Sequence, residues 1–204
     1  MTGARASGRR IGLFGGTFDP PHVGHVAVAE DVADALALDR LFWIPAREPP
    51  HKRGQAVTPA DVRLAMVREA ATADPRFGVA TLELEREGPS YTVDTARVLG
   101  REHPDSELFL IVGADQLAVF DTWRDPEGIV EHVRLAVLDR GGESAAAAAR
   151  TLPAGAEVVV VPVRRVDVSS TDVRERVRDG LDIDDLVPPG VRTIIERERL
   201  YSAA

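Results

Sequence analysis

The sequence contains no cysteine, and this absence excludes disulfide bonds, zinc sites built on thiolates and catalysis by a thiol nucleophile. It also lacks an apolar run long enough to cross a bilayer, so we expect no membrane partner. Positive charge in residues 1–10 is not followed by an apolar segment, so the start of the chain does not resemble a secretory signal. Together these absences favour a cytoplasmic protein.

Positive charge is scarce as well. The chain carries 25 basic and 33 acidic residues, for a net charge of −8, and its single lysine is Lys52. Because proteins that bind nucleic acids present a basic face, this balance argues against a nucleic-acid partner. The lone lysine either marks a place where a compact ammonium group is needed or is there by chance.

What is present fits one globular domain. The chain has 204 residues, of which 44% are hydrophobic and 28% charged, as is typical of a protein that buries a core. Residues 1–9 are predicted to form a flexible tail. We therefore expect a single domain over residues 10–204.

Short apolar runs alternate with segments of helical periodicity, and Thr58 is predicted to cap the second helix. This alternation predicts an α/β fold, a Rossmann-like parallel sheet with helices on both faces, in which ligands bind at the carboxyl ends of the strands. The strands are predicted at residues 11–15, 41–45, 77–85, 108–112, 135–138 and 158–161. The helices are predicted at residues 22–38, 59–73, 92–102 and 189–199, with a further helix capped by Ser169 or Ser170 and running to about residue 178.

The string GGTFDPPHVGH, residues 15–25, follows the first predicted strand and opens the first predicted helix. Gly15 and Gly16 allow a sharp turn and leave room for a ligand close to the backbone. His22 and His25 stand at the helix start, where free N–H groups and the helix dipole favour an anion. Their imidazoles can donate hydrogen bonds to phosphate oxygens, and a bound anion would favour their charged form. The alternative is a structural turn with two capping histidines.

A second candidate for phosphate binding is VSSTDVR, residues 168–174. Its serines and threonine stand at a predicted helix start, where hydroxyl and N–H groups can bind phosphate. Arg174 lies one turn further along, and its planar fork suits phosphate oxygens. Taken alone, the segment fits equally well an ordinary helix cap followed by a surface arginine.

The first string resembles the H-x-G-H signature of the nucleotidyltransferase superfamily, and in full it is especially similar to the start of the nicotinate-mononucleotide adenylyltransferases. VSSTDVR is similar to a second signature of that family, I-S-S-T-x-I-R. The resemblance implies that His22, His25 and Arg174 are catalytic and act on the triphosphate of ATP. A structural and a functional role for Asp19 are both open. The resemblance also implies an ATP-binding set of Gly15, Gly16, Thr17, Phe18, Ser169, Ser170 and Thr171.

Two further segments are similar to ATP-binding elements of the same family. PPHK, residues 49–52, resembles its phosphate-binding loop and would add Lys52 to the site, although a solvated loop with scattered charge is the alternative. GADQL, residues 113–117, follows the most apolar predicted strand. The resemblance implies that Gly113 and Asp115 bind ATP, and a carboxylate at a strand end can accept from ribose hydroxyls.

The acceptor side is indicated by SYTVDT, residues 90–95, and by a tryptophan further along. Both resemble elements of the family that bind the pyridine mononucleotide. Backbone N–H groups around Tyr91 and Thr92 could hold the nicotinate carboxylate, and Trp123 could stack on the flat ring. Taken alone, Trp123 would be a core residue.

A member of this family would transfer the adenylyl group of ATP to nicotinate mononucleotide, giving deamido-NAD and pyrophosphate, a step of NAD biosynthesis. The attacking phosphate is already an anion, so the reaction needs positioning and charge stabilisation but no general base. Mg²⁺ would bridge phosphate oxygens with few protein ligands, and we expect no dedicated metal site. ATP and nicotinate mononucleotide are the expected partners, and a homo-oligomer is compatible with the sequence.

Two other functions remain open from the residues alone. One is transfer to phosphopantetheine, a flavin or a small alcohol phosphate, against which SYTVDT, GADQL and Trp123 argue. The other is a regulator that binds nucleotides without catalysis, because a fold does not determine a function. The sequence says little about nicotinate against nicotinamide, and the acid form is what the resemblance implies.

Overall fold

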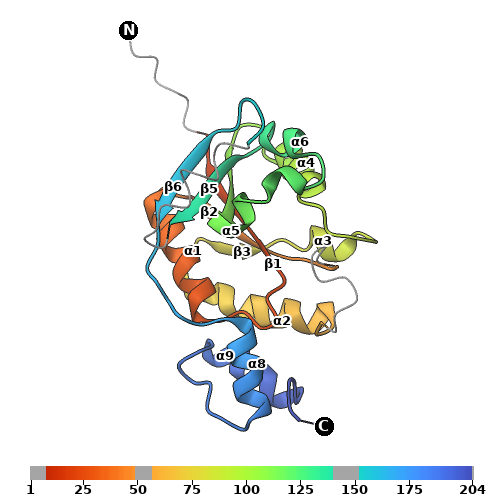
Figure 1. Ribbon diagram of the computed structural model, residues 1–204, viewed down its shortest axis with the longest axis vertical. Helices are drawn as coiled ribbons and strands as arrows, with labels where there is room; N and C mark the ends of the chain where they lie inside the picture. Colours follow the sequence, from red (N-terminus) through yellow and green to blue (C-terminus); the bar gives the residue numbers. More distant parts are fainter. Residues whose placement is uncertain (1–7, 49–56, 140–151, 204) are drawn as a thin grey trace.

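The computed structural model describes residues 8–48, 57–139 and 152–203, and Figure 1 shows their arrangement. Most of the predicted tail, residues 1–9, therefore lies outside the described residues. The same holds for Lys52 and for the alanine-rich stretch around residues 144–149.

Six strands form one sheet in the order β3-β2-β1-β4-β5-β6, and every pairing between neighbours in it is parallel. The chain starts at the centre with β1, moves outward to β3, returns to β4 beside β1, and moves outward again to β6. Between β1 and β4 the order reverses, and such a switch point is where doubly wound sheets bind ligands. The strands are β1 (Arg10–Gly16), β2 (Arg40–Pro45), β3 (Phe77–Val79), β4 (Glu107–Gly113), β5 (Arg134–Asp139) and β6 (Val158–Pro162).

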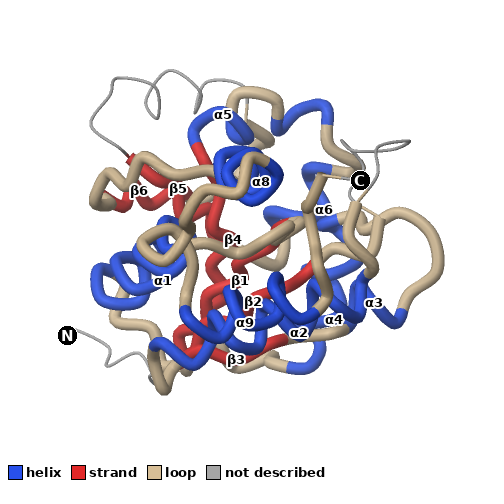
Figure 2. Tube along the Cα trace, turned by 90° about the horizontal axis from the view of Figure 1, so that it is seen from below, coloured by secondary structure: helices blue, strands red, loops and turns tan. Residues whose placement is uncertain are grey.

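Helices lie on both sides of the sheet, as the end-on view in Figure 2 shows. No helix within the described ranges is long and apolar enough to span a membrane. The helices are α1 (Val23–Ala35), α2 (Ala60–Ala70), α3 (Leu82–Glu85), α4 (Thr92–Glu102), α5 (Ala114–Leu117), α6 (Pro126–Val130), α8 (Ser170–Arg178) and α9 (Pro189–Arg197), with 3-10 turns η2 (Ala71–Ala73) and η3 (Phe120–Thr122).

Two hydrophobic clusters show that both faces of the sheet are buried. On β4, Phe109 and Ile111 belong to the cluster under α1, α2 and α9, whereas Leu110 and Val112 belong to the cluster under α4 and α6. Because successive side chains of a strand point to opposite faces, an all-apolar strand is what a doubly covered sheet requires. The predicted Rossmann-like fold with helices on both faces is confirmed.

The strand predicted at residues 77–85 is wrong in its second half. Only Phe77–Val79 pairs with β2, and the chain then turns into α3. Alternating leucine and glutamate in this stretch is compatible with either form. Packing decided the outcome, because the short helix places Leu82 against one of the buried clusters and buries Glu83 as well.

The start of α2 also differs from the prediction. Pro59, not Thr58, occupies the cap position, and the helix begins at Ala60. Thr58 instead makes tertiary contacts: its N–H donates to Asp19 and its hydroxyl to the Tyr201 oxygen. The N–H and hydroxyl groups of Thr58 thus bond to residues distant in the sequence, and Thr58 does not cap the helix.

Candidate active site

Two cavities, of about 460 and 430 Å³, open at the carboxyl ends of the central strands. We call them the first and the second cavity. Both are lined by Phe14 at the end of β1, Gly113 at the end of β4 and Leu138 on β5, so they adjoin one another. They lie at the switch point of the sheet, where the fold predicts a ligand.

The second cavity gathers both phosphate-binding candidates of the sequence. The N-terminus of α1 contributes His22 and His25, and the N-terminus of α8 contributes the serines and Arg174. Two helix N-termini on one cavity add their positive dipole ends to the side-chain cations, which makes the cavity suitable for a polyanion. Its polar lining residues are His22, His25, Asp115, Arg164, Ser169, Ser170, Thr171 and Arg174.

The two histidine rings lie close together, with their centroids 3.7 Å apart and their planes at 33°. The backbone N–H of His22 donates to Nδ1 of His25 over 3.2 Å. Since Nδ1 accepts this bond, the neutral His25 ring carries its proton on Nε2. His25 can therefore donate a hydrogen bond to an anion from Nε2 without first becoming charged.

Sterically, the position between the two histidines favours glycine, because a side chain there would be crowded. A Cβ built on Gly24 would lie 3.1 Å from Nδ1 of His22 and 3.1 Å from a methyl group of Val168. Val168 directly precedes Ser169, the cap residue of α8, so the bare backbone at Gly24 lets the two candidate phosphate-binding segments approach each other. The glycine of the H-x-G-H string thus serves packing.

Gly15 and Gly16 line the first cavity, but neither makes the turn that the sequence predicted. In this turn the left-handed conformation falls on Phe18, with φ 50°. A Cβ on Gly16 would come within 2.8 Å of the Phe18 ring, whereas one on Gly15 would project into open space. Gly16 is therefore needed for the close approach of Phe18 and not for a positive φ.

Phe18 itself lines neither cavity and is only 2% exposed. Its ring packs edge-on against Phe14 at 5.5 Å and is tilted against Trp43 at 5.1 Å. The side chain thus has a packing role, and the predicted ATP-binding role of Phe18, which concerns its backbone, stays a prediction.

Direct hydrogen bonds tie the second motif to the first. The Ser170 hydroxyl donates to the carbonyl of Pro20 over 2.9 Å, and Nη1 of Arg174 donates to the carbonyl of Asp19 over 2.8 Å. Ser169 caps α8, because its hydroxyl accepts from the N–H of Asp172. One edge of the Arg174 guanidinium is therefore held by the protein, which orients the group toward the cavity that it lines.

The sequence left a structural and a functional role open for Asp19, and its contacts in the structure are those of a structural residue. It is 5% exposed, and both of its carboxylate oxygens are used. One accepts from the Tyr201 hydroxyl over 2.6 Å and the other from the Thr58 N–H over 3.2 Å. Asp19 thereby holds the turn between β1 and α1 against the C-terminal segment.

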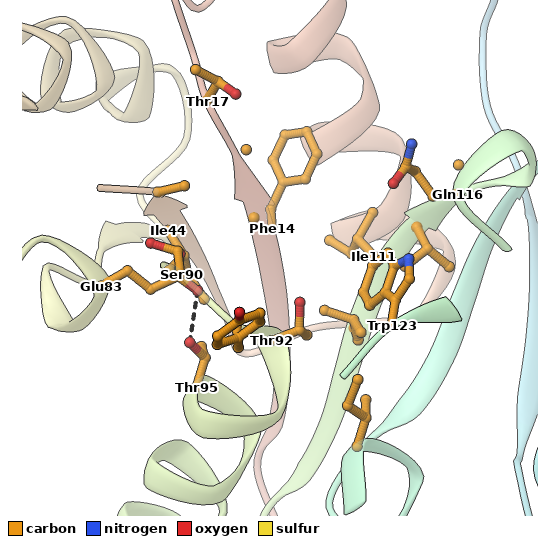
Figure 3. Close-up of a pocket in the computed structure, with 18 of the residues that line it drawn as sticks. Phe14, Thr17, Ile44, Glu83, Ser90, Thr92, Thr95, Ile111, Gln116 and Trp123 are labelled. Carbon is orange, nitrogen blue, oxygen red and sulfur yellow. Dashed lines mark hydrogen bonds between the residues drawn. The ribbon is translucent and has the colours of Figure 1, made fainter. Parts of the chain in front are cut away.

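The first cavity has a largely apolar lining, part of which Figure 3 shows. Ile44 forms part of one wall and Trp123 part of another, and Trp123 is backed by Phe120, whose ring centroid is 5.1 Å away. At the start of α4, Tyr91 is the cap residue and its side chain makes no capping hydrogen bond. The N–H of Asp94 donates to the Tyr91 carbonyl over 3.1 Å, which leaves the N–H groups of Thr92 and Val93 as the candidates to bind a ligand.

A buried carboxyl group also lines the first cavity. Glu83 is 7% exposed, and the Thr95 hydroxyl donates to it over 2.6 Å (Figure 3). Burial raises the pKa of Glu83, and the hydrogen bonds from Thr95 and Ser90 oppose that effect without cancelling it. The Ser90 hydroxyl in turn accepts from the Arg47 N–H, which links the loop after β2 to α4.

The structure brings nearly all of the predicted site residues together. Those expected to bind the acceptor, Tyr91, Thr92 and Trp123, line the first cavity together with Gly15, Gly16 and Thr17. Lys52 lies outside the described residues. Among the charged and amide-bearing lining residues, sequence reasoning missed Glu83, Gln116, Arg124 and Arg164. Gln116 lies inside GADQL and Arg124 follows Trp123, whereas Glu83 and Arg164 reach the cavities only through the tertiary fold.

The fold and the paired cavities define a nucleotide-binding α/β protein of the Rossmann-like type. The model of the cytidylyltransferase-like family matches residues 13–176, which include both motifs. A probable nicotinate-nucleotide adenylyltransferase from Geobacillus thermodenitrificans is 44% identical over 194 residues, covering 95% of this chain and 87% of the relative. The chain belongs to the cytidylyltransferase-like family and, within it, to the nicotinate-nucleotide adenylyltransferases.

Solved structures agree on the fold. The nicotinic acid mononucleotide adenylyltransferase of Plasmodium falciparum, complexed with APC, superposes with a TM-score of 0.77 at 17% identity, covering 95% of this chain and 97% of that one. The same enzyme complexed with NaAD gives a TM-score of 0.76 at 18% identity, with the same coverage. At this level of identity the likeness bears on the fold alone.

Proposed function

We infer that this chain is a nicotinate-nucleotide adenylyltransferase, which transfers the adenylyl group of ATP to nicotinate mononucleotide in NAD biosynthesis. The products are deamido-NAD and pyrophosphate. The observation that carries the inference is the pair of adjoining cavities, one cationic and one largely apolar, in a chain of this family. The complex of the Plasmodium falciparum enzyme with NaAD supports the same assignment.

The second cavity is proposed to hold the triphosphate of ATP. His22, His25 and Arg174 would surround it, and the N–H groups at the start of α8 would bind its oxygens. As bonding changes at the α-phosphate, negative charge shifts to the leaving pyrophosphate. The Nε2–H of His25 would stabilise that charge, since its Nδ1 is already held by the protein.

The first cavity is proposed to hold nicotinate mononucleotide, with its ring against Trp123 and its carboxylate at the start of α4, near Tyr91 and Thr92. The phosphate of the mononucleotide would then face the boundary between the cavities at Gly113. One of its oxygens attacks the α-phosphorus of ATP, a new P–O bond forms, and the bond to the β-phosphate oxygen breaks. No proton needs to be removed, because the attacking oxygen is already an anion.

Mg²⁺ is the proposed cofactor, and the donor set fits an ion held mainly by ATP. The described residues contain no group of three histidine or acidic side chains that could hold a metal. Asp115 is the carboxylate that lines the second cavity and would contact the ion or its waters. When bound, the ion would neutralise charge on the phosphate oxygens.

The remaining assignments are proposals as well. We propose that the protein acts in the cytoplasm with ATP and nicotinate mononucleotide as its partners, and without a nucleic-acid or membrane partner. The net charge of −8 supports the exclusion of a nucleic-acid partner. A homo-oligomer is a further proposal, which sedimentation analysis of the purified protein would test.

The test is pyrophosphate release from ATP and Mg²⁺ with nicotinate mononucleotide, nicotinamide mononucleotide or phosphopantetheine in parallel reactions. Fast release with the nicotinate substrate is the expected result. Release with phosphopantetheine alone would overturn the acceptor assignment while leaving nucleotidyl transfer intact. No release with any of the three would overturn the proposed function.

A further inference from the structure

One cation at the first cavity has no role in the reaction described so far. Arg124 directly follows Trp123 and lines the same cavity. Its guanidinium carbon lies over the Tyr91 ring, 4.6 Å from the centroid. A guanidinium group stacked on an aromatic face is held in place without losing its hydrogen-bond donors. Arg124 therefore presents a positioned charge at the wall where the pyridine ring would lie.

The surrounding acidic groups do not neutralise this cation. The adjacent Asp125 pairs with Arg97 and caps α6 instead. Within the described ranges, no carboxylate forms an ion pair with Arg124. Nine other arginines of the described part do form ion pairs with carboxylates, namely Arg10, Arg76, Arg97, Arg134, Arg164, Arg165, Arg178, Arg192 and Arg197.

The other charged groups near the first cavity are not placed to attract an anionic ring substituent, and Arg124 is. Arg86 also contacts Tyr91, but its guanidinium donates to the backbone carbonyl and does not line the cavity. Glu83 is the carboxyl group in the lining, buried and bonded to Thr95. The protein as a whole carries a net charge of −8, which repels anionic ligands at long range. A second anionic group on the acceptor would thus meet a net unfavourable field without a local cation.

We propose that the Arg124 side chain determines the specificity of the acceptor site for a pyridine mononucleotide that carries a ring carboxylate over one that carries an amide. The inference rests on the proposed function and deepens it. The two acceptors share the ring, the ribose and the phosphate, and differ by one negative charge on the ring substituent. Arg124 attracts that charge across the cavity, whereas the neutral amide gains little from it.

The experiment compares kcat/KM for nicotinate and nicotinamide mononucleotide in the wild-type enzyme and in Arg124→Gln. The variant is expected to lower the ratio of the two constants about three- to tenfold, through a higher KM for the acid, because the contact is partly solvent-exposed. KM for ATP should not change. Arg124→Lys, which keeps the charge but loses the planar stacking, should restore part of the ratio.

The matched control is Arg101→Gln. It removes the same charge from the exposed far end of α4, where the side chain lines neither cavity, and should leave the ratio unchanged. Added salt provides a second readout, since it should lower the wild-type ratio and affect Arg124→Gln less. An unchanged ratio in Arg124→Gln, with wild-type activity on the acid, would overturn this inference alone. A wild-type enzyme inactive on both pyridine substrates would overturn the proposed function instead.

Discussion

At the scale of single residues, the histidine pair shows how a short motif prepares a site. The bond from the His22 N–H to Nδ1 of His25 fixes which nitrogen carries the proton. Because Nδ1 is occupied as an acceptor, Nε2 is the ring atom of His25 that would donate to a phosphate oxygen of ATP.

His25→Ala tests this role. Because His25 is proposed to act on charge that develops during the reaction, the variant should lower kcat about 100-fold while changing KM for ATP much less. Steady-state kinetics of pyrophosphate release would measure both constants. His103→Ala, which removes an imidazole stacked on Phe42 away from both cavities, is the control. Turnover of His25→Ala near the wild-type value would remove the histidine from the mechanism.

Glu83 gives a prediction about pH. Its pKa is raised in the folded protein by burial, so on raising the pH the unfolded chain loses its proton first. The folded state therefore loses stability relative to the unfolded state as pH rises from the unfolded pKa toward the folded pKa. Glu83→Gln cannot ionise and should gain stability relative to the wild type over that window.

Urea unfolding at a series of pH values from about 4 to 7 would measure this difference. Glu87→Gln, at an exposed position of the following loop, is the control and should follow the wild type. A difference in unfolding free energy between Glu83→Gln and the wild type that does not change with pH would contradict the prediction.

At the scale of elements, Arg63 on α2 joins the loops that follow β1 and β2. It is 1% exposed and donates to four backbone carbonyls, which belong to Thr17, Ala46, Arg47 and Thr58. Thr17 and Ala46 line the first cavity. One buried guanidinium group thus fixes two strand ends that line the first cavity, the proposed acceptor site.

Arg63→Met keeps most of the side-chain volume but leaves those carbonyls without a donor. It should destabilise the protein by about 3 kcal/mol, because buried polar groups that lose their partners are costly. Denaturant unfolding would measure the loss, with Arg68→Met on the exposed face of the same helix as the control. A variant as stable as the control would show that water or a rearranged loop satisfies the carbonyls.

At the scale of the whole molecule, the C-terminal segment contacts the GGTFDPPHVGH string, residues 15–25, near the other end of the chain. The hydroxyl of Tyr201 donates to Asp19, 182 residues away in the sequence, over 2.6 Å. Burial raises the pKa of Tyr201, so the hydroxyl keeps its proton for this bond at any physiological pH. The turn between β1 and α1, which leads to His22, is thereby held from the far end of the chain.

Tyr201→Phe removes that hydroxyl and leaves one oxygen of Asp19 without its partner. The free energy of unfolding should fall by about 1.5–3 kcal/mol, since hydrogen bonds to charged groups contribute about that much. Thermal and denaturant unfolding would measure the change. Ser202→Ala, at the exposed next position, should have no effect. Equal stability of Tyr201→Phe and the wild type would show that the hydrogen bond from Tyr201 to Asp19 does not stabilise the folded protein.

The sequence by itself determined the parallel α/β sheet, the five longer helices and the two motifs that meet at the second cavity. These features are local: apolar runs specify strands buried on both faces, and helical periodicity specifies the longer helices. The helix over residues 92–102 and that over 170–178 were predicted within the observed bounds. The family resemblance added the reaction, which composition and spacing alone left open.

The tertiary structure alone decided what depends on partners distant in the chain. It turned residues 82–85 into a helix, buried Phe18 in the core, gave Asp19 its two partners and placed Arg124 on Tyr91. In each case the local pattern allowed more than one outcome. Which outcome formed was set by the apolar surface and hydrogen-bond partners that the assembled sheet presented, and no short stretch of sequence contains that information.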